Sequence, residues 1–189
     1  TSSLVGSEMC IRDRSILLEF FIISKGKMWD AVHDVLRRKA AQGVDVRMIY
    51  DDVGCATGLP AQYWKTLQVE GIQAVPFNPF VPLLNLVMNS RDHRKIVVVD
   101  GKTAFTGGFN LADEYINQKE RFGYWCDTGV RLQGPAAWSF ATIFLELWAS
   151  QRPDDPGLDA YREEQPFPAE EPTIGLVPVS YTHLTLPTI

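Results

Sequence analysis

The feature that most restricts the fold is an alternation of apolar strand-like runs with amphipathic helical segments. Residues 15–23, SILLEFFII, form an apolar run of strand length. Residues 28–41 then carry apolar side chains at helical spacing, and Gly43 follows at the position of a helix-terminating glycine. Residues 44–50 form the next strand-like run. A strand, a helix and a second strand joined by short connections predict a right-handed βαβ unit.

The later elements widen this unit into a larger sheet. We expect a helix over residues 60–70, a strand over 72–77 and a β-hairpin over 96–106. A helix over 111–118, a strand over 125–133 and a final helix over 135–150 should follow. This order of elements predicts an α/β protein with a mixed β-sheet and helices on both faces.

Both ends of the chain differ from this pattern. Residues 1–14 include SEMCIRDR, and residues 179–189 read VSYTHLTLPTI. Both resemble translated sequencing-adapter text, so we expect them to be non-native or disordered. Residues 151–178 are rich in Pro, Asp and Glu and predict a linker that leads to the start of a second half. The domain itself is expected over residues 15–150.

The net charge of the chain, −5, comes from its C-terminal part. Residues 15–150 contain 14 basic and 14 acidic residues, so the predicted domain is neutral. A neutral domain argues against a general nucleic-acid partner, which usually requires a basic face. The three cysteines have neither metal nor redox spacing. The most apolar stretch, residues 16–23, is too short to span a membrane.

Residues 92–110, DHRKIVVVDGKTAFTGGFN, are the most informative part of the sequence. The β-branched run Ile96–Val99 predicts a buried strand, and Asp100-Gly101 predicts a tight hairpin turn. His93 and Lys95 are two residues apart at the start of this strand. Side chains at that spacing share a face, so both should point the same way.

Two hairpin registers are open at this point. A loop formed by residues 100–101 places His93 opposite Gly108, and the missing side chain there leaves room for a ligand. A loop formed by residues 101–102 instead places residue 94 opposite residue 109.

A helix beginning at Asn110 would add its N-terminus to this space, with Asn110 as the capping residue. An imidazole, an ammonium, a glycine gap and a helix N-terminus together predict an anion site of the phosphate type.

These residues resemble the motif of the phospholipase D superfamily, which is H-x-K, four residues, D, six residues and G-G/S-x-N. The matching positions, with every spacing kept, are His93, Lys95, Asp100, Gly107, Gly108 and Asn110. The flanking text, NPFVPLLN and NLADEYIN, is similar to the bacterial cardiolipin-synthase branch. The resemblance covers residues 15–153 and implies an α/β/α sandwich that is the first of two halves.

The resemblance also implies a role for each residue. His93 would be the nucleophile that forms a phosphohistidine, and Lys95 would hold the non-bridging phosphate oxygens. Gly108 and the Asn110 amide would contact the phosphate. Asp127 matches the carboxylate that orients the nucleophilic histidine. No metal and no cofactor is implied.

Two motif residues are expected to be structural. Asp100 is seven residues from His93, so strand parity turns it to the opposite face, at the hairpin turn. Gly107 is likewise expected to have a structural role in the backbone.

The function that follows by resemblance is transfer of a phosphatidyl group between two phosphatidylglycerols by a protein at the cell membrane. Its partners would be phospholipid and the membrane surface, with no nucleic acid. Because no second H-x-K motif is present, a second catalytic half of the same chain or a homodimer partner would also be needed. Two alternatives remain open: a one-motif phosphodiesterase or nuclease active as a homodimer, and a lipid-binding module without activity.

Three further stretches have competing interpretations. Asp51-Asp52, after a strand, could serve a metal or a general base, but a solvent-exposed turn or helix start is favoured. His33 is expected to be a surface residue rather than a catalytic one. The apolar residues 78–89 either pack on the core or form a lip that contacts acyl chains or the bilayer surface.

Overall fold

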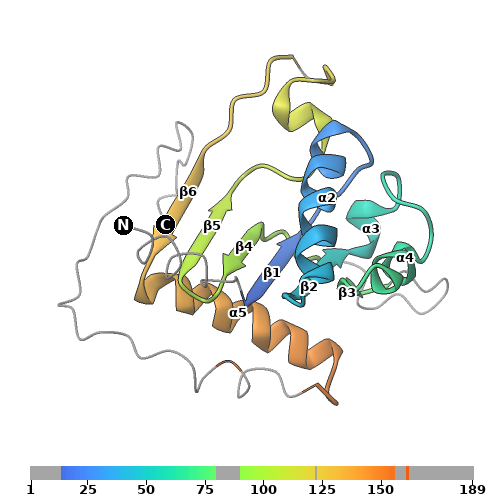
Figure 1. Ribbon diagram of the computed structural model, residues 1–189. Coiled ribbons are helices and arrows are strands. Elements are labelled where there is room, and N and C mark those ends of the chain that lie inside the picture. Colours follow the sequence, from blue (N-terminus) through green and yellow to red (C-terminus); the bar gives the residue numbers. More distant parts are fainter. Residues whose placement is uncertain (1–13, 80–89, 122, 156–160, 162–189) are drawn as a thin grey trace, which may run out of the picture.

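The computed structural model describes residues 14–79, 90–121, 123–155 and 161, and its centre is one six-stranded sheet (Figure 1). The strand order is β3-β2-β1-β4-β5-β6. The strands are β1 (Ser15–Phe20), β2 (Asp45–Asp51), β3 (Gln73–Phe77), β4 (Ile96–Val99), β5 (Thr103–Gly107) and β6 (Gly129–Gln133).

The sheet is mixed, as the sequence predicts. β1, β2 and β3 are parallel, whereas β4, β5 and β6 continue the sheet with antiparallel pairs. The βαβ crossover from β1 to β2 runs through α2 (Lys27–Ala41), and the short helices α3 (Asp52–Cys55) and α4 (Tyr63–Val69) lie between β2 and β3. The fold class predicted from the order of elements is confirmed.

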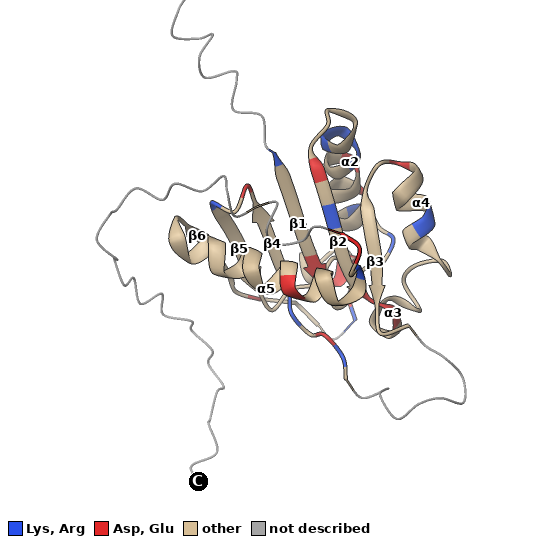
Figure 2. Ribbon diagram, turned by 90° about the horizontal axis from the view of Figure 1, so that it is seen from below, with Lys and Arg blue, Asp and Glu red and all other residues tan. Residues whose placement is uncertain are grey.

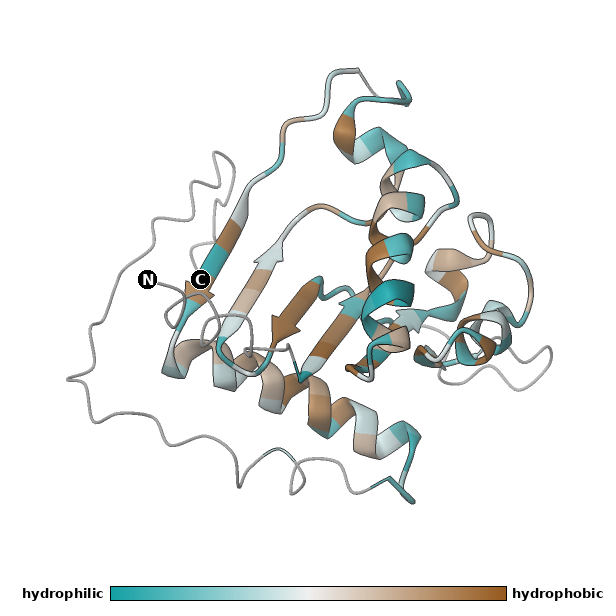
Figure 3. Cartoon of the chain, in the orientation of Figure 1, coloured by the Kyte–Doolittle hydropathy of each residue, from teal (hydrophilic) through white to brown (hydrophobic). Residues whose placement is uncertain are grey.

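Helices cover both faces of the sheet and create two cores. Leu18 of β1 packs with Trp29 of α2 on one face, and Leu17 packs with Phe144 of α5 (Pro135–Gln151) on the other. α2 alternates between hydrophilic and hydrophobic residues (Figure 3), as expected of a helix with one solvent face. α5 is almost free of charge and lies along the sheet (Figure 2). Because both faces are covered, β1 is buried at all six residues.

The hairpin register differs from both predicted registers. Asp100 and Gly101 have positive φ angles of 55° and 63°, and the Lys102 amide donates to the Val99 carbonyl at 3.0 Å, so the predicted tight turn exists. However, the ladder pairs Val99 with Thr103, so Lys102 is added to the predicted two-residue loop of Asp100 and Gly101. The paired region ends at Ile96 and therefore does not reach the histidine.

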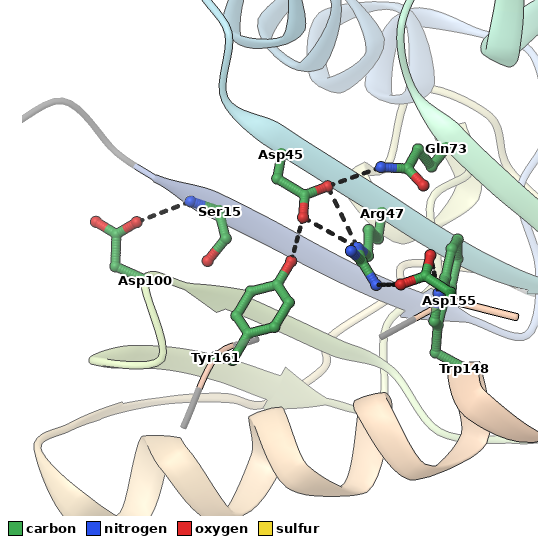
Figure 4. Close-up of polar contacts among 8 residues, drawn as sticks. All are labelled: Ser15, Asp45, Arg47, Gln73, Asp100, Trp148, Asp155 and Tyr161. Atoms are coloured by element: carbon green, nitrogen blue, oxygen red, sulfur yellow. Dashed lines mark hydrogen bonds and ion pairs between the residues drawn. The ribbon is translucent and has the colours of Figure 1, made fainter. Parts of the chain in front are cut away.

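Asp100 ties this turn to the start of β1. Its carboxylate accepts from the Ser15 amide at 3.0 Å (Figure 4) and from the Arg14 amide at 2.6 Å. The Asp100 amide in turn donates to the Ser15 carbonyl. The turn residue thus joins two neighbouring strands at the end of the sheet where β1 begins.

The helix predicted over residues 111–118 is wrong. The segment contains only one short 3₁₀ turn, Asp113–Ile116, closed by Asn117 at a φ of 56°. Asp113 instead caps α2: its carboxylate accepts from the amides of Lys27 and Met28, at 3.1 and 2.9 Å. α2 has no capping side chain of its own, so this distant residue satisfies its first amides.

An ionic cluster lies where β2 begins, on the face covered by α5 (Figure 4). Arg47, with 7% of its side chain exposed, pairs with Asp45 at 3.0 Å and with Asp155 at 2.9 Å. Its guanidinium lies 5.3 Å from the ring centroids of both Trp148 and Tyr161. The first residues of the predicted linker therefore pack on the sheet.

The stretch proposed as an apolar lip falls mainly on residues 80–89, and both predicted terminal segments fall mainly on residues 1–13 and 162–189. These ranges lie outside the described residues. Among the helices that are described, none combines the length and the apolar character needed to cross a membrane.

Candidate active site

His93 and Lys95 lie side by side just before β4. The Lys95 Nζ is 3.0 Å from the His93 Nδ1 and donates to the His93 carbonyl at 2.5 Å. Both side chains therefore turn to the same side, as their spacing predicts. Their exposure differs sharply, because Lys95 is 5% exposed whereas His93 is open to solvent. The Lys95 backbone is held by the Thr106 hydroxyl, which donates to its carbonyl at 2.9 Å.

Phe21, directly after β1, forms the floor under this pair. Its ring lies 4.4 Å from the His93 ring between centroids, at 42°, and the Lys95 ammonium lies 5.3 Å from the same ring. The aromatic face excludes water from one side of the imidazole and attracts the cation. The sequence contains no signal for this role, since Phe21 belongs to an unbroken apolar run.

The electrostatics of the pair favour a neutral imidazole beside an ammonium. Burial lowers the pKa of Lys95 to about 8, although the nearby carboxylates of Asp92 and Asp127 act in the opposite direction. Partial burial, followed by the charge of Lys95, also lowers the pKa of His93. Near neutral pH His93 therefore keeps a lone pair, while Lys95 remains largely charged.

Gly108 is not an empty gap in front of His93. A Cβ on Gly108 would lie 2.4 Å from the Asp127 Oδ1, and a Cβ on Gly107 would lie 2.6 Å from the Thr128 carbonyl. The two glycines are needed because the strand that leads into β6 passes close to their backbone. The predicted glycine gap is thus occupied by Asp127.

Asp127 precedes β6, rather than lying within a strand that begins at Trp125. Its carboxylate accepts from the amide of Thr128 at 2.8 Å and from the Trp125 indole at 3.3 Å. Between the described residues no hydrogen bond joins Asp127 to His93. Its charge acts on Lys95 instead and raises the pKa of the ammonium against the effect of burial.

Asn110 does not cap a helix, and this prediction is wrong. Its side chain is 2% exposed; the Oδ1 accepts from the Ile22 amide at 2.9 Å, and the Nδ2 donates to the Tyr115 hydroxyl at 2.7 Å. Ile22 is next to Phe21, so Asn110 fixes the segment that carries the floor of the site. The 3₁₀ turn that follows begins only at Asp113, so Asn110 contributes no helix N-terminus to the site.

Three buried acids lie behind the motif on the face covered by α5. Glu19, Asp51 and Asp92 are 1%, 1% and 9% exposed, and two arginines reach them. Arg94 contacts Glu19 and Asp92, and Arg91 contacts Asp51 at 3.4 Å. Sequence reasoning missed Glu19, although a single carboxylate inside an apolar strand is a legible signal.

Asp51 starts a helix, as predicted, but it is not exposed. Its carboxylate accepts from the Gly54 amide at 2.8 Å as the cap of α3, and its second oxygen is buried without a partner among the described residues. His33, by contrast, lies on α2 with 18% of its side chain exposed, 2.5 Å from Glu70 and stacked on Trp29. The described residues contain no group of side chains suited to hold a metal ion.

Comparison with known families decides what this arrangement belongs to. The family model described as the phospholipase D-like domain of cardiolipin synthase matches residues 13–148. The chain belongs to this family. The match includes every motif residue from His93 to Asn110, and it agrees with the resemblance carried by their spacing.

Several relatives cover the same part of the chain. It is 41% identical over 134 residues to cardiolipin synthase 2 of Bacillus cereus, matching 70% of this chain and 26% of the relative. It is 40% identical over 141 residues to a cardiolipin synthase of Staphylococcus aureus, matching 74% and 28%. An uncharacterised protein of Streptococcus mutans is 47% identical over 142 residues, 75% of this chain and 31% of that protein. The chain thus spans about a third or less of the curated relatives it matches.

The solved structure of NucT from Helicobacter pylori shares the fold. The two superpose with a TM-score of 0.53 at 13% identity, over 79% of this chain and 87% of the other. At this identity the similarity concerns the architecture of the domain and supports the fold class.

Proposed function

We propose that the chain is the amino-terminal catalytic half of a cardiolipin synthase-like phosphatidyltransferase that uses His93 as its nucleophile. The observation that carries this proposal is the contact between an exposed imidazole and a buried ammonium 3.0 Å away. The imidazole is accessible to a phosphodiester, and the ammonium is held where a phosphate bound to the ring would meet it.

The reaction would proceed in two displacements at phosphorus. A lone pair of the His93 ring attacks the phosphorus of a phosphatidylglycerol, a nitrogen–phosphorus bond forms, and glycerol leaves after its oxygen takes up a proton. The primary hydroxyl of a second phosphatidylglycerol then attacks the phosphohistidine and loses its proton. The nitrogen–phosphorus bond breaks, and the product carries two phosphatidyl groups on one glycerol.

Lys95 would neutralise the non-bridging oxygens as negative charge develops on them. In the resting site its ammonium is bonded to the His93 ring, so an entering phosphate would draw the ammonium away and release the ring nitrogen. Asp127 would hold the ammonium between these states and orient the histidine once the phosphate is bound. Gly108 and the second amide hydrogen of Asn110 complete the proposed phosphate contacts.

The proton donor for the leaving glycerol would come from outside this chain. The two other histidines lie far from the motif in sequence, and His33 is engaged with Glu70 on α2. A second catalytic half, or a partner copy, would supply it, and the length of the relatives favours a second half. The complete protein would act at the cell membrane, where its phospholipid substrates are.

The test uses the complete protein that carries this chain, presented with phosphatidylglycerol vesicles. We expect cardiolipin formation by the wild type and by His33→Asn, the matched control, and none by His93→Asn. Label from phosphatidylglycerol should remain on the wild-type protein after a rapid alkaline quench, because a phosphoramidate survives in base. Cardiolipin formation by His93→Asn would refute the nucleophile. Cleavage of DNA without lipid transfer would refute the substrate class and favour the nuclease alternative.

A further inference from the structure

The cluster of Glu19, Asp92 and Arg94 has no role in the reaction described above, yet it adjoins the motif. Glu19 pairs across the β1–β4 ladder with Ile96, so it lies at the end of β4 that leads back to the histidine. Asp92 and Arg94 alternate with His93 and Lys95 along the chain. Asp92 and Arg94 therefore turn to Glu19, while His93 and Lys95 turn to the site.

Arg94 bridges the two acids unequally. Its Nε donates to the Asp92 Oδ1 at 2.9 Å, its backbone amide donates to the same oxygen at 3.2 Å, and its Nη2 reaches the Asp92 Oδ2 at 3.4 Å. The Glu19 Oε1 lies only 2.6 Å from the same Nε, but the hydrogen there points at Asp92. Asp92 therefore accepts the hydrogen bonds of the arginine, whereas Glu19 lies close to the guanidinium without accepting a hydrogen bond from it.

As a carboxylate, Glu19 would be poorly satisfied. Both of its oxygens are inaccessible to water, and neither has a geometrically sound donor among the described residues. A buried ionised carboxylate without donors costs several kcal/mol. A proton shared between Glu19 and Asp92 removes this cost, because the protonated acid becomes a donor to the ionised one.

We propose that Glu19 is a positioning residue that holds a proton, donates it in a hydrogen bond to Asp92, and with Arg94 clamps residues 92–95 so that His93 and Lys95 keep their contact. The expected effect on turnover rests on the proposed function, whereas the expected effect on the contact between His93 and Lys95 does not.

The ionisation of the two acids is consistent with this clamp. Burial, then the hydrogen bond with Asp92, raises the pKa of Glu19 to about 9. The pKa of Asp92 is lowered despite its burial, because Glu19 and Arg94 both donate to it. Near neutral pH the cluster therefore holds one neutral acid, one carboxylate and one guanidinium, which is a balanced set.

The experiment compares Glu19→Gln with Glu19→Met in the complete protein. The amide of Gln imitates the protonated acid, since it can donate to Asp92, whereas Met fills the volume without donating. We expect Glu19→Gln to keep wild-type kcat and KM within about threefold, and Glu19→Met to lose about 10- to 100-fold in kcat with KM unchanged. Glu70→Gln, which alters another partly buried paired acid away from the site, is the control and should match the wild type.

A second readout needs no lipid. NMR titration of the His93 imidazole should give the wild-type pKa in Glu19→Gln and a higher one in Glu19→Met, because a loosened Lys95 no longer depresses it. Equal loss of kcat in Glu19→Gln and Glu19→Met would overturn the proposal, since the ionised form would then be the one required. Wild-type behaviour of both variants would overturn it as well. If the titration follows the expectation while the wild type transfers no lipid, the clamp stands and the proposed function fails.

Discussion

The two ends of the sheet face covered by α5 hold two ionic clusters that differ in one respect. Where β2 begins, Arg47 lies between Asp45 and Asp155, and each carboxylate has further donors. About four residues further along the sheet, roughly 13 Å away, Glu19 and Asp51 retain buried oxygens without a donor among the described residues. The first cluster is fully satisfied, and the second is not.

This difference is consistent with a structural role for the first cluster and the proposed functional role for the second. Arg47 joins β2 to α5 and the chain that follows it, and its carboxylate partners keep further donors. The cluster behind the motif holds an excess of acid and stands next to His93 and Lys95. A buried group without a donor requires an explanation, and the proposed function supplies one at the end of the sheet that carries His93 and Lys95.

The largest effect is expected from Lys95→Met, which removes the cation of the site. Loss of this charge should lower kcat/KM for phosphatidyl transfer by about 10²- to 10³-fold, as for other donors that stabilise developing charge. The free energy of unfolding should not fall, because the lysine is buried and its pKa is depressed to about 8. Lys102→Met, at an exposed position of the same hairpin, is the control. A loss of stability in Lys95→Met with unchanged turnover would show that this end of the sheet is structural rather than functional.

Arg47→Met should show the opposite behaviour. It leaves Asp45 and Asp155 without their shared cation and should lower the free energy of unfolding by about 3 kcal/mol in urea denaturation. That is the low end for a broken buried pair, because both acids keep hydrogen-bond donors. Turnover per folded molecule should not change. Arg37→Met removes an exposed pair on α2 and should cost less than about 1 kcal/mol.

Much of the fold was predictable because the information is local. The βαβ unit, the strand Ile96–Val99 and the Asp100-Gly101 turn each follow from a short pattern of side chains. The extra residue Lys102 does not, since the register depends on how β4 pairs with β1 and β5 together. The helix over residues 111–118 failed for a similar reason: Asp113 is committed to the amides of α2, 85 residues away in sequence.

The arrangement of the candidate site was only partly predictable. The spacing of His93 and Lys95 predicted their common side, whereas Asp127 was proposed only from the family resemblance. That Asp127 fills the space at Gly108, and that Asn110 binds the Ile22 amide, depends on contacts between segments that the sequence alone does not align. Glu19 could have been noticed as a single carboxylate in an apolar run, but its contact with Arg94 could not be read from the sequence.

The pH dependence of stability should distinguish the two clusters. In the folded protein Glu19 keeps its proton up to about pH 9, while in the unfolded chain it releases the proton near 4.5. The folded state therefore binds more protons in this window, and stability contributed by Glu19 is lost as pH rises from about 4.5 to about 9.

Glu19→Gln cannot release a proton, so its free energy of unfolding should rise relative to the wild type across that window. Urea denaturation at several pH values measures the difference, with Arg94 and Asp92 unchanged as its neighbours. Glu146→Gln, an exposed acid on α5, should show a much smaller trend. A difference between Glu19→Gln and the wild type that does not vary with pH would contradict a protonated Glu19.

The smallest effect is expected from Tyr161→Phe at the satisfied end. The Tyr161 hydroxyl bonds to the Asp45 carboxylate, and its ring lies over Arg47 (Figure 4). Removing the hydroxyl leaves the ring contact and the Arg47 pairs in place, so about 1 to 2 kcal/mol of unfolding free energy should be lost. Tyr124→Phe, at an 87% exposed position, should change it by less than about 0.5 kcal/mol. Equal values for the two variants would show that the chain after α5 is not held by this bond, and that Arg47 and Asp155 alone join it to β2.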